Sequence, residues 1–156
     1  MKIAVVDDSK FTRMVIKQIL NDLSNTDFCW EAENGKVALE KNTRDPVDLI
    51  ISDLEMPVLD GLQLLKTVIG GEAKTNCLLI SAFHKSNQPK IIDALKAGAI
   101  GFIEKNSLGK GFDINSLKKE IDKYINFLTQ DNILKKEIRA TSLENHPRKP
   151  VIKNRA

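Results

Sequence analysis

The stretch that decides the fold is DLIISDLEMPVLDG, residues 48–61. Val47 and the first part of this stretch form a short apolar run, which predicts a buried strand over residues 47–52. Asp53 follows this strand directly, and Asp60 and Gly61 stand at the start of an amphipathic segment. The stretch therefore predicts a strand, a tight loop that begins with a carboxylate, and a helix.

Similar units precede and follow this one along residues 1–128. The predicted strands are 3–6, 28–32, 47–52, 77–81 and 100–104, and the predicted helices are 11–23, 35–43, 61–69, 89–97 and 114–128. Five strands alternating with five helices through short connections favour a parallel sheet that is covered on both faces. We expect a small doubly wound α/β domain, a class whose sites lie at the carboxyl ends of the strands.

The first predicted helix follows Ser9, a residue type that commonly caps helix N-termini. Its sequence has an apolar side at helical spacing. The residues assigned to that side are Phe11, Met14, Val15, Gln18, Ile19 and Leu23. We expect this side to face the sheet.

The length of 156 residues suits one domain with a tail. We expect the domain to occupy residues 1–128. Residues 129–156 are predicted to form a basic tail or linker, partly helical near 131–139 and flexible over 144–156. The tail holds seven Lys or Arg and three Asp or Glu, so it accounts for the net charge of +3. The domain itself gives no electrostatic reason to expect nucleic acid as a partner.

The sequence predicts neither a signal peptide nor a membrane span. Met1 is followed at once by a strand-like run, without the basic and then apolar pattern of a signal peptide. No apolar stretch approaches the ~18 residues that a membrane span needs. We therefore expect a cytoplasmic protein.

Polar side chains follow four of the predicted strands. Asp7 and Asp8 follow the first, Asp53 the third, Ser81 ends the fourth, and Lys105 follows the fifth. The carboxyl ends of parallel strands share one edge of a sheet, so these groups should converge there. Three carboxylates that lie together repel one another unless a cation binds among them. Ligands that are all oxygen favour Mg²⁺ or Mn²⁺ over zinc.

Asp53 is the candidate nucleophile of this group. It leaves a buried strand and enters a tight loop, which places a short carboxylate side chain at the predicted site. An aspartyl phosphate is a mixed anhydride that hydrolyses readily, and such a bond suits a reversible mark. Taken one at a time, these residues would be ordinary turn, cap or surface residues, so the functional interpretation depends on their joint placement.

At these residues the sequence resembles the response-regulator receiver family, over nearly all of residues 1–128. The matching segments are VVDDSKFTR (5–13), DLIISDLEMPVLDG (48–61), LLISA (78–82) and AGAIGFIEK (97–105). The resemblance implies a flavodoxin-like (βα)₅ fold with the strand order 2-1-3-4-5. It also implies a signalling phosphoprotein of a two-component system rather than an enzyme.

The resemblance assigns roles to the acidic residues. Asp53 resembles the phosphoacceptor, and Asp7 and Asp8 resemble the acidic pair that holds Mg²⁺. Asp53 and the backbone carbonyl of Glu55 would be further ligands of this ion. The phosphoryl donor in this family is a histidine kinase or phosphotransfer protein, and the domain assists both its own phosphorylation and its dephosphorylation.

Three other residues resemble the part of the family that senses phosphorylation. Lys105 resembles the lysine that pairs with the phosphoryl group, and Ser81 the hydroxyl that contacts it. Phe102, three residues before the lysine, occupies the aromatic switch position. In the family, phosphorylation draws the hydroxyl and then the ring inward, which changes the face made by the fourth and fifth strands and helices. This face binds a downstream protein target.

The sequence departs from the family pattern at two places. Asn106 follows Lys105 where the family usually has proline, so the geometry of the loop NSLGKGF (106–112) is expected to differ. Glu55 stands two residues after Asp53, at a position whose side chain faces the phosphoryl group in the family that this sequence resembles. We expect a longer-lived phosphoryl group than with a small or amide side chain there.

Alternative functions remain at this point. Both DDSxxxR and the long loop after Lys105 resemble chemotaxis regulators, including receivers attached to a methylesterase, so the chain could be the N-terminal receiver of a larger regulator. A phosphatase of the haloacid-dehalogenase type would want a second aspartate where Glu55 stands. A degenerate receiver that is never phosphorylated is disfavoured, because every phosphorylation residue is present.

Overall fold

The computed structural model describes residues 1–105 and 113–145. The strands are β1 Lys2–Val6, β2 Asp27–Ala32, β3 Leu49–Ser52, β4 Asn76–Ser81 and β5 Gly101–Glu104. The helices are α1 Lys10–Asp22, α2 Gly35–Arg44, α3 Gly61–Ile69, α4 Gln88–Ala97 and α5 Ile114–Asn145. Strands and helices alternate through the described chain, as the sequence predicts.

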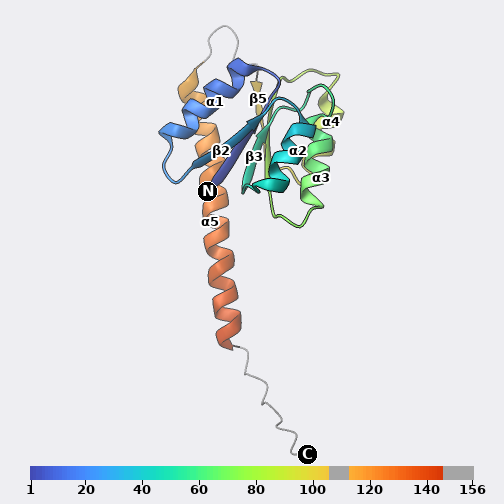
Figure 1. The fold of residues 1–156 in the computed structure, drawn as a ribbon. Helices are drawn as coiled ribbons and strands as arrows, with labels where there is room; N and C mark the ends of the chain where they lie inside the picture. The colour runs from blue at the N-terminus through green and yellow to red at the C-terminus, as the bar shows by residue number, and fades with distance from the viewer. Residues whose placement is uncertain (106–112, 146–156) are drawn as a thin grey trace, which may run out of the picture. The chain divides into compact units, whose positions relative to one another are not determined.

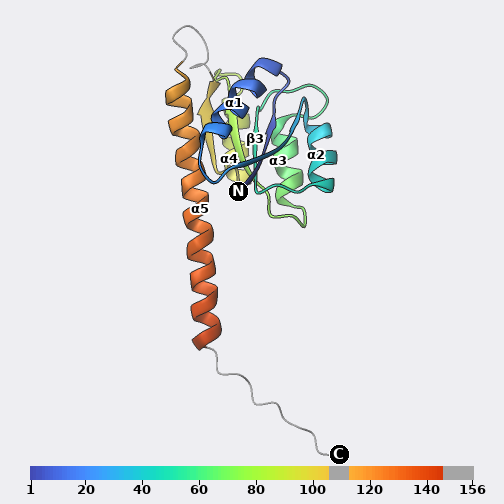
Figure 2. The same ribbon diagram turned by 60° about the vertical axis from the view of Figure 1, so that its left-hand side comes forward.

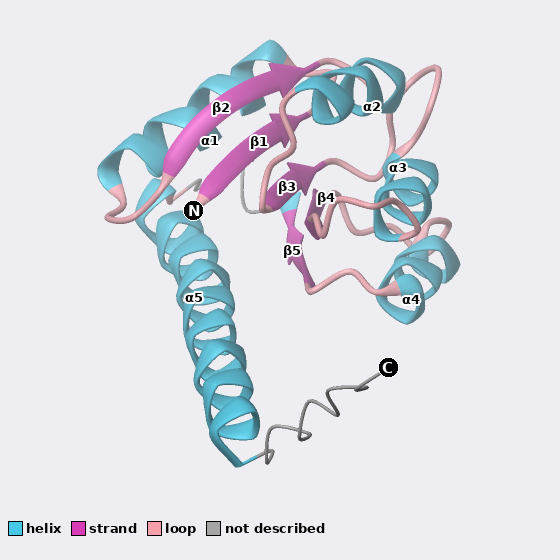
Figure 3. Cartoon of the chain, turned by 60° about the horizontal axis from the view of Figure 1, so that its bottom comes forward, coloured by secondary structure: helices cyan, strands magenta, loops and turns pink. Residues whose placement is uncertain are grey.

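The five strands form one parallel sheet in the order β2-β1-β3-β4-β5. In Figure 3 the strands appear in this order across the sheet. Helices α2, α3 and α4 cover one face, and α1 and the first turns of α5 cover the other (Figures 1 and 2). The expected fold class, a flavodoxin-like doubly wound sheet, is confirmed.

The central strands are buried on both faces of the sheet. Successive side chains of a strand point to opposite faces. The side chains of Ile3 to Val6 in β1 and of Leu49 to Ile51 in β3 are nearly all completely buried. Strands of this kind are continuous apolar runs in the sequence, which explains why they could be predicted from it.

The predicted inward side of α1 is partly wrong. Ser9 caps the helix as predicted, since its hydroxyl oxygen accepts a hydrogen bond from the amide of Thr12. However, Phe11 and Met14 are 64% and 57% exposed. The buried residues of the helix are Thr12, Val15, Ile16, Ile19 and Leu20. This compact, largely aliphatic stripe packs inward in place of the two larger side chains, a choice that helical spacing alone does not make.

The chain divides into two compact units, Met1–Tyr124 and Ile125–Ala156. Helix α5 is continuous across the division and includes the segment 131–139 that was predicted as helical. The domain boundary at residue 128 stays a prediction. The flexible tail was predicted to begin at residue 144, but residues 144 and 145 are helical, and its remaining residues 146–156 lie outside the described residues. The predicted loop 106–112 also lies outside the described residues.

Among the described residues, no helix combines the length and apolar character needed to cross a membrane.

Candidate functional site

Sheet register brings the first two site residues together. Val6 of β1 pairs with Ser52 of β3, so Asp7 and Asp53 leave their strands side by side. The amide of Asp53 donates to the carbonyl of Val6 at 2.9 Å, which extends the pairing by one residue. Both carboxylates are therefore carried by strand ends at the centre of the sheet.

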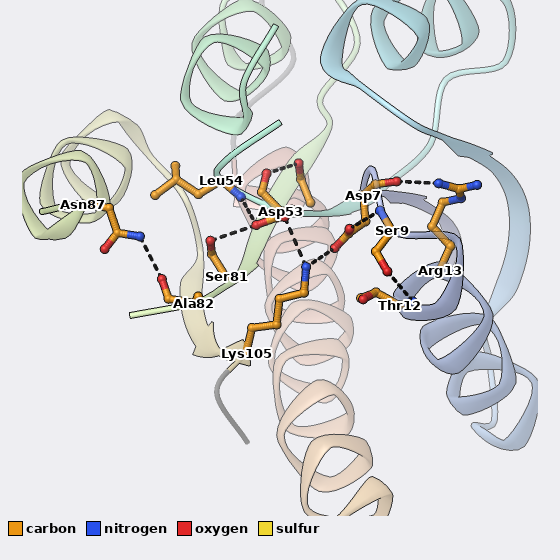
Figure 4. Close-up of polar contacts among 11 residues, drawn as sticks. Asp7, Ser9, Thr12, Arg13, Asp53, Leu54, Ser81, Ala82, Asn87 and Lys105 are labelled. Carbon is orange, nitrogen blue, oxygen red and sulfur yellow. Dashed lines mark hydrogen bonds and ion pairs between the residues drawn. The ribbon is translucent and has the colours of Figure 1, made fainter. Parts of the chain in front are cut away.

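Three hydrogen-bond donors surround the Asp53 carboxylate (Figure 4). Its Oδ1 accepts from the amide of Leu54 at 2.7 Å and from the hydroxyl of Ser81 at 2.8 Å. Its Oδ2 accepts from the Nζ of Lys105 at 3.2 Å. The residue is only 6% exposed, so this carboxylate is held in one orientation by contacts from three strand ends.

Lys105 links the two buried carboxylates. Its Nζ lies 2.9 Å from Oδ2 of Asp7 and 3.2 Å from Oδ2 of Asp53. Burial alone would lower the pKa of the ammonium. The hydrogen bond to Asp7 and the negative charges of Asp53 and Asp7 outweigh this effect, so the pKa of Lys105 lies above its ordinary value. The site therefore keeps a positive charge beside Asp53 at neutral pH.

The turn that carries Asp7 is fixed by its neighbours. Oδ1 of Asp7 accepts from the amide of Ser9 at 2.8 Å, and the carbonyl of Asp7 accepts from Nη1 of Arg13 at 2.7 Å. Burial raises the pKa of the Asp7 carboxyl, and the charge of Asp53 adds to this, although the hydrogen bonds from Lys105 and Ser9 oppose it. A nearby cation would stabilise the ionised form of this buried carboxylate.

The arrangement of the acidic residues is compatible with a divalent cation site. Asp7, Asp8 and Asp53 each offer a carboxylate oxygen, and the three atoms lie within 4.8 Å of one another. Three carboxylates face one ammonium, so the cluster has an excess of negative charge that a divalent ion would neutralise. All three ligands are oxygens, the donor type that Mg²⁺ and Mn²⁺ prefer. The structure thus supports the predicted metal site, while the role of the Glu55 carbonyl stays a prediction.

The loop after Asp53 is tied to α4 by a lysine that sequence reasoning missed. The Nζ of Lys90 lies 3.6 Å from Oε2 of Glu55 and 3.4 Å from Oδ2 of Asp60. Asp60 caps α3 through a capping box with Gln63. These groups are partly exposed, so the ion pairs add little stability, but they place a positive charge next to Glu55. The position of Lys90 in the first turn of a helix gave no signal of this contact.

The two residues of the predicted switch lie on adjacent strands. Ser81 is buried at the end of β4, and its hydroxyl already contacts Asp53. Phe102 in β5 is partly buried and packs against the core cluster. Their assignment as a switch stays a prediction.

The comparisons with known proteins agree with this geometry. Residues 3–122 match the family model of the response regulator receiver domain. The chain is 36% identical over 125 residues to the chemotaxis protein CheY of Bacillus subtilis. The match covers 80% of this chain and 98% of CheY. The chain belongs to the response regulator receiver domain family.

Other relatives are longer. A protein-glutamate methylesterase/protein-glutamine glutaminase of Syntrophomonas wolfei is 35% identical over 122 residues, which are 78% of this chain and 34% of that protein. The chain thus spans about a third of the length of this relative.

Solved structures show the same fold. The response regulator domain of Thermotoga maritima CheB has a TM-score of 0.69 and 31% identity, and the match covers 81% of this chain and 93% of that one. CheY6 of R. sphaeroides, solved in complex with the P1 domain of CheA3, has a TM-score of 0.64 and 28% identity, with 80% and 96% coverage.

Proposed function

We propose that the protein is a phosphoacceptor of a two-component phosphorelay and that Asp53 receives the phosphoryl group. The observation that carries the proposal is the buried Asp53 carboxylate, which contacts the Leu54 amide, the Ser81 hydroxyl and the Lys105 ammonium at once. A purely structural aspartate would need no neighbouring carboxylates, whereas a phosphoryl-transfer site needs a metal ion and positive charge around its nucleophile.

The residues divide the work of the transfer. An Asp53 oxygen attacks phosphorus, and the bond from phosphorus to the donor breaks, so that the donor leaves with the electron pair. Asp7, Asp8 and Asp53 would hold Mg²⁺ or Mn²⁺, which supplies charge neutralisation to the phosphoryl oxygens when bound. Lys105 balances a further part of that charge, and Ser81 donates a hydrogen bond to a phosphoryl oxygen.

Acetyl phosphate tests the proposal directly. In the presence of Mg²⁺ and this small phosphodonor, the intact mass of the protein is expected to rise by one phosphoryl group. The bond formed should be cleaved by hydroxylamine, as expected for an acyl phosphate. Absence of any mass increase, with Mg²⁺ binding shown separately, would contradict the proposal.

Mg²⁺ is expected to stabilise the protein through the three carboxylates. A metal concentration of about 100 times Kd should increase the free energy of unfolding by ~2.7 kcal/mol, because the ion binds the folded site. Thermal unfolding with and without Mg²⁺ measures this effect. Asp8 is exposed, so Asp8→Asn should fold normally yet lose most of the metal response. An equal response in both proteins would place the ion elsewhere.

Glu55 is expected to prolong the life of the phosphoryl group. Its carboxylate is paired with Lys90 and has no hydrogen-bond donor to orient an attacking water, whereas an amide side chain has one. Glu55→Asn should speed autodephosphorylation about fivefold, which corresponds to a barrier lower by ~1 kcal/mol. Loss of the phosphorylated mass over time gives the rate. The control is Glu72→Asn, a substitution of an exposed residue beyond the C-terminal end of α3. An unchanged or slower rate in Glu55→Asn would overturn the assignment.

The partners proposed for this chain are a histidine kinase or phosphotransfer domain and a downstream protein. The complex of CheY6 with a CheA3 P1 domain supports the first, since that protein shares the fold and 28% of its sequence. The second would bind the face formed by β4, α4, β5 and the start of α5. We propose that the domain itself acts as a signalling domain rather than an enzyme.

A second candidate is the receiver of a larger regulator. The similarity to a methylesterase favours this alternative, because the matched part is only 34% of that protein's length. The reading frame that encodes the protein discriminates the two: continuation past Ala156 into a catalytic domain supports the larger regulator. The phosphatase alternative is disfavoured because Glu55, whose carboxylate is paired with Lys90, stands where those enzymes have an aspartate.

A further inference from the structure

Asn87 occupies the N-cap position of α4 but does not cap the helix. Ser9, Asn34 and Asp60, at the same position of α1, α2 and α3, each accept a hydrogen bond from the amide three residues on. Their ψ angles are 112°, 171° and 174°, the extended conformation of a capping residue. Asn87 instead has φ −104° and ψ 0°, and its side chain makes no capping bond.

The side chain of Asn87 forms hydrogen bonds with the loop that precedes the helix. Its Nδ2 donates to the carbonyl of Ala82 at 2.8 Å, and its Oδ1 accepts from the amide of His84 at 3.0 Å (Figure 4 shows the first of these). The residue is only 5% exposed. Asparagine is a preferred capping residue, so its use elsewhere leaves α4 without a side-chain cap.

These contacts connect Asn87 to the phosphoacceptor through one short path. Ala82, whose carbonyl Asn87 binds, directly follows Ser81 in the chain. The Ser81 hydroxyl contacts Oδ1 of Asp53 at 2.8 Å. A phosphoryl group on Asp53 would place new acceptor oxygens beside the Ser81 hydroxyl. A backbone shift of Ser81 toward them would displace the carbonyl of Ala82 and weaken its hydrogen bond with Asn87.

We propose that Asn87 is a positioning residue that exchanges partners when Asp53 is phosphorylated. In the state described here its amide group holds the loop 82–84. In the phosphorylated state the side chain leaves Ala82, the backbone of Asn87 becomes extended, and Oδ1 caps the amide of Lys90 in the first turn of α4. The exchange carries the change at Ser81 into the start of α4, because the chain enters that helix through Asn87. This inference rests on the proposed phosphorylation of Asp53.

Two substitutions separate the two roles of the side chain. Asn87→Asp keeps an oxygen that can cap Lys90 and gains from the helix dipole, but it cannot donate to Ala82. Asn87→Ala can do neither. Without phosphorylation, hydrogen exchange of the Lys90 amide should slow about fivefold in Asn87→Asp, equivalent to ~1 kcal/mol, and should not slow in Asn87→Ala. Gln88→Ala, an exposed neighbour, is the control.

The phosphorylated parent protein provides the second measurement. After treatment with acetyl phosphate and Mg²⁺, the Lys90 amide should gain protection while the side-chain amide of Asn87 loses it. A merely structural Asn87 would give lower stability in both variants and no protection of Lys90 in either. The proposal is overturned if Lys90 is unprotected in Asn87→Asp, or if both amides are unchanged in protein whose mass shows the phosphoryl group. If no phosphoryl group is taken up, the proposed function fails, and the Asn87→Asp result still decides whether the capped state exists.

Discussion

Asp53→Asn is expected to abolish phosphorylation by acetyl phosphate while the protein stays folded. The amide oxygen of asparagine can still accept from the Leu54 amide and the Ser81 hydroxyl, as Oδ1 does now. The amide nitrogen, however, is not a nucleophile, and it would face the ammonium of Lys105. Lys105 keeps its contact with Asp7, so the site should not collapse. Intact mass measured with time is the assay.

A second carboxylate in the same loop supplies the control. Asp60 caps α3, and asparagine caps helices about as well as aspartate, so Asp60→Asn should fold and still be labelled. The expected pattern is therefore one phosphoryl group in the parent and in Asp60→Asn, and none in Asp53→Asn. Labelling of Asp53→Asn to the same extent as the parent would show that another residue is the acceptor.

Gly61→Ala is expected to cause the largest loss of stability among single changes near the site. A Cβ at Gly61 would lie 2.2 Å from the carbonyl oxygen of Asp53 and 2.9 Å from Cα of Leu54. Both are backbone atoms, which cannot rotate away, and the Gly61 amide also donates to the carbonyl of Leu54 at 2.8 Å. The start of α3 would have to move away from the strand end that carries Asp53. We expect a loss of at least ~3 kcal/mol and a fall in Tm of roughly 10 °C.

Gly70→Ala is the matched control for this change. At Gly70 the nearest atom to a new Cβ lies 3.5 Å away, and the backbone is right-handed, with φ −78°. Its free energy of unfolding should therefore stay within ~0.5 kcal/mol of that of the parent. Chemical denaturation of the three proteins measures the difference. A Gly61→Ala protein as stable as Gly70→Ala would mean that the loop after Asp53 adapts easily.

Asp53, Asp7, Ser81 and Lys105 could be placed from the sequence because one physical rule governs them all. Each stands at the carboxyl end of an apolar run, and parallel strands present those ends at one edge of the sheet. The caps Ser9 and Asp60 were equally local, since a short polar side chain can reach an amide three residues on.

Other features depend on groups that meet only after folding. Lys90 is 30 residues from Asp60, and the sequence gives no reason to pair them. Val58 has φ 72°, a left-handed conformation that a β-branched residue rarely adopts, so its own preference predicts a different backbone. The tight loop between β3 and α3 overrides that preference.

The sequence by itself determined the sheet, its covering helices and the residues of the acidic site, because burial and strand ends leave periodic, local marks. Only the tertiary structure decided that Phe11 and Met14 face outward, since helix packing selects one of two overlapping apolar stripes. It also decided that Asn87 serves the loop rather than α4, because that choice depends on the position of a carbonyl five residues away.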